Sequence, residues 1–175
     1  PQRGVAAIAD GVSSSLFAAP WAKILAEAAV AAPPNVHQSD SLFPWLSAGR
    51  ARWNEEVDTD NLAWHQKDKL QQGAQSTLLW VQLLPPDERD QQNPDLPRLV
   101  CYSIGDCCLL HARGSQMLRA FPIDRSEAFA ENPQVLTSIE NKQDQSLPFV
   151  QLYDCCEPGD LLILCTDAIG AWAIK

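Results

Sequence analysis

Short apolar runs bounded by Gly, Pro and Asp recur along the chain and predict strands. The first, Val5 to Ala9, stops abruptly at Asp10-Gly11, and an apolar run of this length that ends at turn residues is typical of a strand. Similar runs predict strands over 78–84, 99–104, 107–112, 116–121, 149–153 and 161–166. Because the run from Leu161 to Cys165 is apolar throughout, we expect the last of these to be a buried strand.

Apolar residues at helical spacing predict helices over 16–32, within 40–70 and over 168–174. The first carries Trp21, Ile24 and Leu25 on one face and ends before Pro33-Pro34. In the second region we expect one long and one short helix, with Trp45, Trp53 and Trp64 as core residues and no cofactor role. His37 and His65 lack acidic or cysteine neighbours at ligand spacing, so we interpret both as structural.

Turn residues divide the middle of the chain. Gly105-Asp106 and the residues 113–115 separate three successive strand runs, which predicts an antiparallel meander. The proline-rich, charged segment 85–97 predicts an exposed hairpin loop. The polar segment that follows the meander predicts one helical turn over 134–139.

Composition narrows the class of protein. At 175 residues with 46% apolar residues, the chain is expected to fold as one domain. Its net charge of −9 disfavours nucleic acids and anionic membrane surfaces as partners, because both would repel it. No apolar run is long enough to span a membrane and no signal peptide opens the sequence, so we expect a cytoplasmic protein.

Six cysteines occur, two pairs of them adjacent in sequence. Neighbouring residues of a strand point to opposite faces, so an adjacent pair is poorly placed to share one metal ion or to form a disulfide. We find no pairs at the spacing of a zinc knuckle. We therefore expect reduced, mostly buried thiols without bound metal.

Three acids stand at strand ends: Asp10, Asp106 and Asp167. Asp10 and Asp167 share one pattern, in which an apolar strand ends in Asp, followed by a small residue and a helix. Carboxylates gathered at one edge of a sheet suit a hard cation such as Mg²⁺ or Mn²⁺. Each Asp is explained equally well as a cap of a turn or helix, and the pattern alone leaves both interpretations open.

Four blocks in this order resemble the metal-dependent type-2C (PPM) serine/threonine protein phosphatases of the bacterial type. Residues 5–12 look like the family's strand ending in Asp-Gly, and 73–78 are similar to its Gly-Gly-Thr-Thr-Leu strand start. Residues 103–107 resemble its Gly-Asp-Ser block. The most specific block is 159–168, where a Gly-Asp turn, an apolar strand and a terminal Asp all agree. The match spans almost the whole chain and is weakest over 34–70.

The resemblance implies a fold and a site. It implies an α+β fold of two antiparallel β-sheets packed face to face with helices on both outer sides, an α/β/β/α sandwich. It also implies two Mn²⁺ or Mg²⁺ ions, with Asp10 bridging them, the Gly11 carbonyl contacting one, Asp167 binding one, and Asp106 helping to hold a weaker third. Water activated by the metal pair would then hydrolyse phosphoserine or phosphothreonine in a phosphoprotein or phosphopeptide substrate.

The chain also departs from the family pattern. The family's first motif, an arginine with an acidic ligand, and its last, an Asp-Asn or Asp-Asp block, lie outside residues 1–175, which we interpret as a single phosphatase-like catalytic domain. Ala168 replaces a glycine, and the segment between Phe121 and Phe149 is short for the family's flap. Two alternatives therefore stay open: a non-catalytic phosphatase-like domain that acts as a binding or regulatory module, and a structural α+β domain with ordinary turn aspartates.

Overall fold

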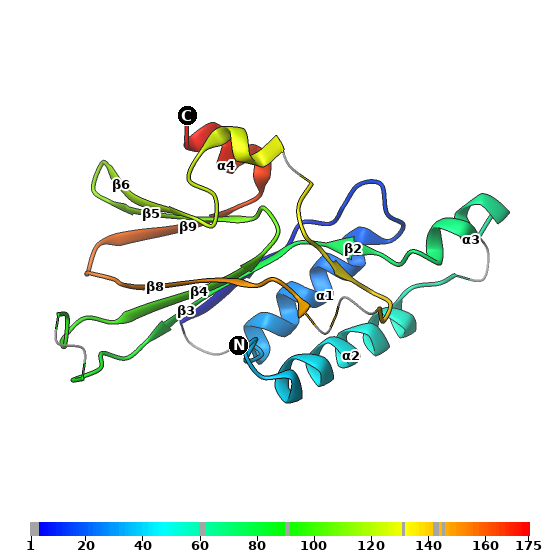
Figure 1. Ribbon diagram of the computed structural model, residues 1–175, viewed down its shortest axis with the longest axis horizontal. Coiled ribbons are helices and arrows are strands. Elements are labelled where there is room, and N and C mark those ends of the chain that lie inside the picture. The colour runs from blue at the N-terminus through cyan, green and yellow to red at the C-terminus, as the bar shows by residue number, and fades with distance from the viewer. Residues whose placement is uncertain (1–3, 60–61, 90–91, 131, 142–143, 145) are drawn as a thin grey trace.

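The chain folds into four layers, helix, sheet, sheet and helix (Figure 1). The computed structural model describes residues 4–175 apart from 60–61, 90–91, 131, 142–143 and 145. The predictions made for the side chains of Trp64 and His65 lie outside the described part. The α+β sandwich expected from the sequence is thus the observed fold.

The first sheet has the strand order β1-β3-β4-β8, and the second has the order β6-β5-β9. All strand pairs are antiparallel. The strands of the first sheet are β1 (Val5–Ile8), β3 (Leu78–Leu84), β4 (Arg98–Ile104) and β8 (Val150–Cys155). Those of the second are β5 (Cys108–Arg113), β6 (Gln116–Phe121) and β9 (Asp160–Cys165). A short pair, β2 (Gln75–Ser76) with β7 (Leu136–Thr137), extends from the first sheet toward the helices (Figure 1).

Helices cover the two outer faces (Figure 1). The first sheet is covered by α1 (Ala18–Ala31) and α2 (Ser39–Glu56), and the short α3 (Trp64–Leu70) lies beyond them. Part of the outer face of the second sheet, around Cys108, Leu110 and Cys165, is covered by α4 (Asp167–Ala173) and a 3-10 turn, η1 (Ser126–Ala130). Pro20 lies in the first turn of α1, where a missing N–H is tolerated.

Strand β3 supplies two of the three cores. Successive side chains of a strand point to opposite faces, and here Leu78 and Trp80 pack against the helices while Leu79 and Val81 pack between the sheets. Trp53 is buried in the helix-side core and Trp45 packs against it, as expected. The third core lies under α4 and contains Cys108, Leu110 and Cys165.

Three local predictions are wrong. The strands β4 and β5 do not form a hairpin, because the chain crosses at Gly105-Asp106 from the first sheet to the second; only β5 and β6 pair as the meander required. Residues 134–139 form no helical turn, since Leu136 and Thr137 pair with β2. Strand β9 is buried on one face only, and Leu161 and Ile163 on the other face are 56% and 47% exposed.

Most cysteines are buried, as the sequence predicted. Five of them, Cys101, Cys107, Cys108, Cys156 and Cys165, are buried and Cys155 is half-buried. No disulfide joins cysteines within the described residues. Among those residues, we also find no helix with the length and apolar character needed to cross a bilayer.

A buried ion pair connects α2 to the segment after β7. The Arg50 guanidinium donates to both carboxylate oxygens of Asp144 at 2.8 and 3.0 Å and to the Thr137 carbonyl at 3.1 Å. Both side chains are about nine-tenths buried. Removing one partner of such a pair leaves the other charge buried without compensation.

We expect Arg50→Ala to lower the free energy of unfolding by about 3–5 kcal/mol, measured by urea denaturation at pH 7. Arg52→Ala on the same helix is the matched control, because Arg52 pairs with Glu27 and Glu56 at a partly exposed site and its loss should cost less than about 1 kcal/mol. Equal losses in the two variants would contradict the role assigned to Arg50.

Candidate functional site

Three carboxylates from distant parts of the chain meet at one cavity of about 340 Å³. Asp10 follows β1, Asp106 lies in the crossing between the sheets, and Asp167 begins α4. The cavity is lined by Asp10, Gly11, Val12, Ser13, Thr77, Asp106, Phe129, Pro133 and Asp167. All four residues singled out from the sequence as site residues, Gly11 included, are therefore brought together.

Hydrogen bonds from β2 and from Thr77, the residue between β2 and β3, hold the backbone of Asp10. Its carbonyl accepts from the Thr77 N–H and from the Ser76 hydroxyl, both at 2.9 Å. Its own N–H donates to Thr77 Oγ1 at 3.3 Å. Two residues on, the Val12 N–H donates to the Gln75 carbonyl at 2.9 Å. These bonds continue the strand pairing past β1 and hold the Asp10 backbone at the rim of the cavity.

Two glycines allow the close approaches that the cavity needs. A Cβ on Gly11 would lie 2.8 Å from backbone atoms of Ala18, so only glycine lets the chain pass the start of α1. Gly105 has a φ of +97°, and a Cβ there would lie 2.4 Å from Thr77 Cγ2. Since a positive φ of this size disfavours residues with side chains, Gly105 is what allows Asp106 to follow β4 directly at this site.

Asp167 is placed by the start of α4. Thr166 is the last extended residue, with a ψ of 174°, and the Asp167 carboxylate accepts from the Ala168 N–H at 2.6 Å. The replacement of the family's glycine by Ala168 is thus compatible with the structure, because Ala168 is helical and exposed.

Burial and mutual repulsion raise the pKa of two of the carboxyls. For Asp10 the larger cause is burial, followed by the charge of Asp167, while the Gly11 N–H opposes the rise in pKa. The pKa of Asp106 is raised by burial and, less strongly, by Asp167 and Asp10. Like charges gathered in a half-buried cavity are unfavourable unless a cation neutralises them.

The donor set fits a hard divalent cation. Carboxylate and carbonyl oxygens are the ligands that Mg²⁺ and Mn²⁺ prefer, and no basic side chain is among the residues that line the cavity in the described structure. The oxygens of the three acids do not all lie within 4.8 Å of one another among the described residues. They surround the cavity, so water or a substrate oxygen would have to complete the coordination of an ion held there.

Sequence reasoning overlooked the residues that support these acids. Ser76 and Thr77 lie in a block quoted only for its resemblance, although two hydroxyl residues directly before a buried strand are a usable signal. Phe129 and Pro133 line the cavity and gave no sequence signal, because they belong to the irregular segment after β6.

Comparison with known proteins defines the fold. No family model matches the sequence, and no curated protein matches it. Among solved structures, one with the same arrangement is a serine/threonine phosphatase, so the chain has a phosphatase-like fold. That protein is PstP/Ppp of Mycobacterium tuberculosis, 17% identical, with a TM-score of 0.53 over 95% of this chain and 69% of the other. A likeness at this level of identity shows the fold alone.

The repulsion among the carboxylates at the cavity predicts that neutralising one of them does not lower the stability of the metal-free protein. The pKa of Asp10 is higher in the folded protein than in the unfolded one, so the folded protein holds a proton on this carboxyl more tightly. In the absence of metal, the free energy of unfolding therefore falls as pH rises from about 4 through the raised pKa. In EDTA at pH 7, Asp10→Asn should therefore keep or raise the Tm, by up to about 3 °C.

The control is Asp124→Asn, which removes a charge from an exposed carboxyl. Its Tm in EDTA should match that of the wild type at both pH 5 and pH 7. A fall in the Tm of Asp10→Asn at pH 7 would show that the carboxylate stabilises the metal-free protein and would refute the electrostatic account.

Proposed function

We propose that this chain is a metal-dependent protein phosphatase that hydrolyses phosphoserine and phosphothreonine in proteins. The observation that carries the proposal is the convergence of Asp10, Asp106 and Asp167 on one cavity. The likeness of the fold to that of a serine/threonine phosphatase supports it. Mn²⁺ or Mg²⁺ is the proposed cofactor, on the basis of the all-oxygen donor set.

The proposed roles follow the positions of the residues. Asp10, the Gly11 carbonyl and Asp167 would hold the metal pair, and Asp106 would hold a more weakly bound third ion. When bound, such ions supply an activated water and neutralise charge on the phosphoryl oxygens. Ser76 and Thr77 orient Asp10 through its backbone, so they are positioning residues. Phe129 and Pro133 line the cavity and would supply its apolar contacts to a substrate.

The decisive assay uses the full-length gene product with p-nitrophenyl phosphate, and then with phosphoserine and phosphothreonine peptides. We expect turnover only with added Mn²⁺ or Mg²⁺. Asp10→Asn and Asp167→Asn should each lower kcat/KM by at least about 100-fold, since loss of a direct ligand exceeds the loss seen for residues that only support ligands. Asp106→Asn should be milder, because its proposed ion is the weaker one.

Asp124→Asn, which alters an exposed carboxyl, is again the control and should retain full activity. Turnover without a divalent metal, or full activity of Asp10→Asn, would exclude the mechanism. A folded, inert protein that binds phosphopeptides would instead support the non-catalytic binding module.

A further inference from the structure

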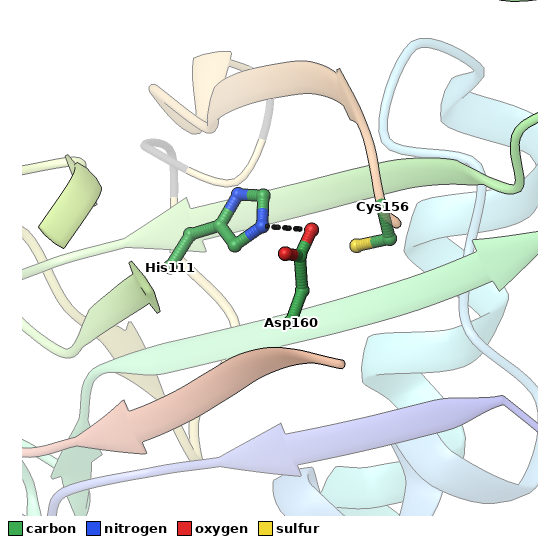
Figure 2. Close-up of side chains that lie close together, drawn as sticks. All are labelled: His111, Cys156 and Asp160. Atoms are coloured by element: carbon green, nitrogen blue, oxygen red, sulfur yellow. Dashed lines mark hydrogen bonds and ion pairs between the residues drawn. The ribbon is translucent and has the colours of Figure 1, made fainter. Parts of the chain in front are cut away.

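A second cluster of metal-ligand side chains lies away from the carboxylate cavity. His111 in β5, Asp160 at the start of β9 and Cys156 after β8 place their ligand atoms within 4.8 Å of one another (Figure 2). His111 and Cys156 are buried, and the Asp160 side chain is only 2% exposed. No other group of three His, Cys, Asp or Glu residues meets this distance among the described residues.

We propose that His111, Cys156 and Asp160 form a zinc-binding site that connects the two sheets. An imidazole nitrogen, a thiolate and a carboxylate oxygen are the three ligand types that Zn²⁺ binds in proteins. Around a tetrahedral zinc ion with bonds of 2.0–2.3 Å, ligand atoms lie roughly 3.5 Å apart. The present separations therefore need an adjustment of about 1 Å, with water as the fourth ligand.

This site is distinct from the proposed catalytic centre. Asp160 and Asp167 stand at opposite ends of β9, which at about 3.3 Å per residue separates them by roughly 20 Å. The ligands also differ in kind, since sulfur and nitrogen favour zinc while an all-oxygen cavity favours Mg²⁺ or Mn²⁺. The zinc proposal therefore stands or falls independently of the phosphatase proposal.

The imidazole of His111 is already turned toward the other two ligands. Its Nε2 lies 2.9 Å from Asp160 Oδ2, and Figure 2 shows this edge of the ring facing Asp160, with Cys156 beyond. Nδ1 is buried without a hydrogen-bond partner in the described structure. Nε2 is thus the nitrogen that faces the other two ligands, and an ion bound there would leave the N–H of Nδ1 without an acceptor among the described residues.

The two oxygens of Asp160 are placed for different tasks. Oδ1 accepts from Arg113 Nε at 2.7 Å. Oδ2 accepts from His111, from Arg113 Nη2 at 3.1 Å and from the Glu157 N–H at 2.8 Å. A metal ion at Oδ2 would take the place of the His111 hydrogen bond and of at least one of the other two donors to Oδ2. Oδ1 would keep Arg113 Nε, and Glu157 also accepts from Arg113 at 2.7 Å.

Charge and protonation set the conditions for binding. The two charges of Zn²⁺ and that of Arg113 would balance those of the Cys156 thiolate, Asp160 and Glu157. Burial, aided by Asp160 and Asp154, raises the pKa of Cys156 to about 11, so the thiol is protonated at neutral pH. Binding would replace the S–H bond by an S–Zn bond and the Nε2–H bond by an N–Zn bond. The thiol proton would pass to solvent and the neutral imidazole would carry its proton on Nδ1, so affinity should rise with pH.

The site would join the two sheets. Cys156 follows β8 of the first sheet, and its N–H donates to the Pro97 carbonyl beside β4 at 2.9 Å. His111 and Asp160 belong to the second sheet. A zinc ion bound by all three residues would connect the first sheet to the second where the chain passes from β8 to β9. This proposal replaces, for Cys156 alone, the expectation that the cysteines bind no metal.

The test titrates the chelator-treated full-length protein with CoCl₂, because a thiolate bound to Co²⁺ gives a charge-transfer absorption band in the near ultraviolet. We expect one Co²⁺ per chain with this band, displaced by ZnCl₂, and a Zn²⁺-dependent rise in Tm. Cys156→Ser should abolish the band and weaken Zn²⁺ binding by at least about 100-fold. The matched control, Cys155→Ser, changes the neighbouring thiol and should keep both.

Two further variants make the test specific. His111→Gln, which retains a side-chain amide donor near Asp160, should also weaken Zn²⁺ binding, and circular dichroism establishes that each variant is folded. Asp10→Asn should leave the band intact, because it alters only the other site. Absence of a thiolate band in the wild type, or an unchanged band in a folded Cys156→Ser, would overturn the proposal.

Discussion

The two-sided burial of β3 is the constraint on which the rest of the structure depends. Its alternate side chains belong to different cores, Trp80 on the helix side and Leu79 between the sheets, so the strand can neither slip by one residue nor rotate without emptying both. Ser76 and Thr77 directly precede it and hold the Asp10 backbone. The packing of one strand thereby sets the position of a carboxylate at the cavity rim.

The gathering of three acidic side chains at this cavity makes the folded state electrostatically unfavourable there. Residues from both sheets deliver acidic groups to one half-buried cavity, and the resulting rise in the pKa of Asp10 and Asp106 disfavours the ionised, metal-free state. Sites that work by charge commonly reduce the stability of the fold that carries them. The interior packing of the sandwich, including the buried Arg50–Asp144 pair, offsets that cost.

Local sequence patterns predicted the longer strands and helices and the strand-end acids, because an apolar run followed by Asp is a local signal, but they missed the short pair of β2 and β7. They failed where the answer depended on distant partners. Gly105-Asp106 looks like any hairpin turn, yet β5 pairs with β9 and not with β4. His111 lies in an apolar strand, and its partner Asp160 is 49 residues away, so no spacing rule could join them. The exposed face of β9 could not be predicted either, because an unbroken apolar run does not show that its strand lies at the edge of a sheet.

The crossing of the chain at Gly105 also orders events in time. Strand β5 emerges from the ribosome well before its partner β9, so the second sheet must wait for a long loop to close, a slow step in folding. Asp167 follows β9 after one residue, Thr166. Until that strand docks, Asp10 and Asp106 are without the third carboxylate. A nascent chain is therefore unable to assemble the cavity early, and the three carboxylates come together only in the finished fold.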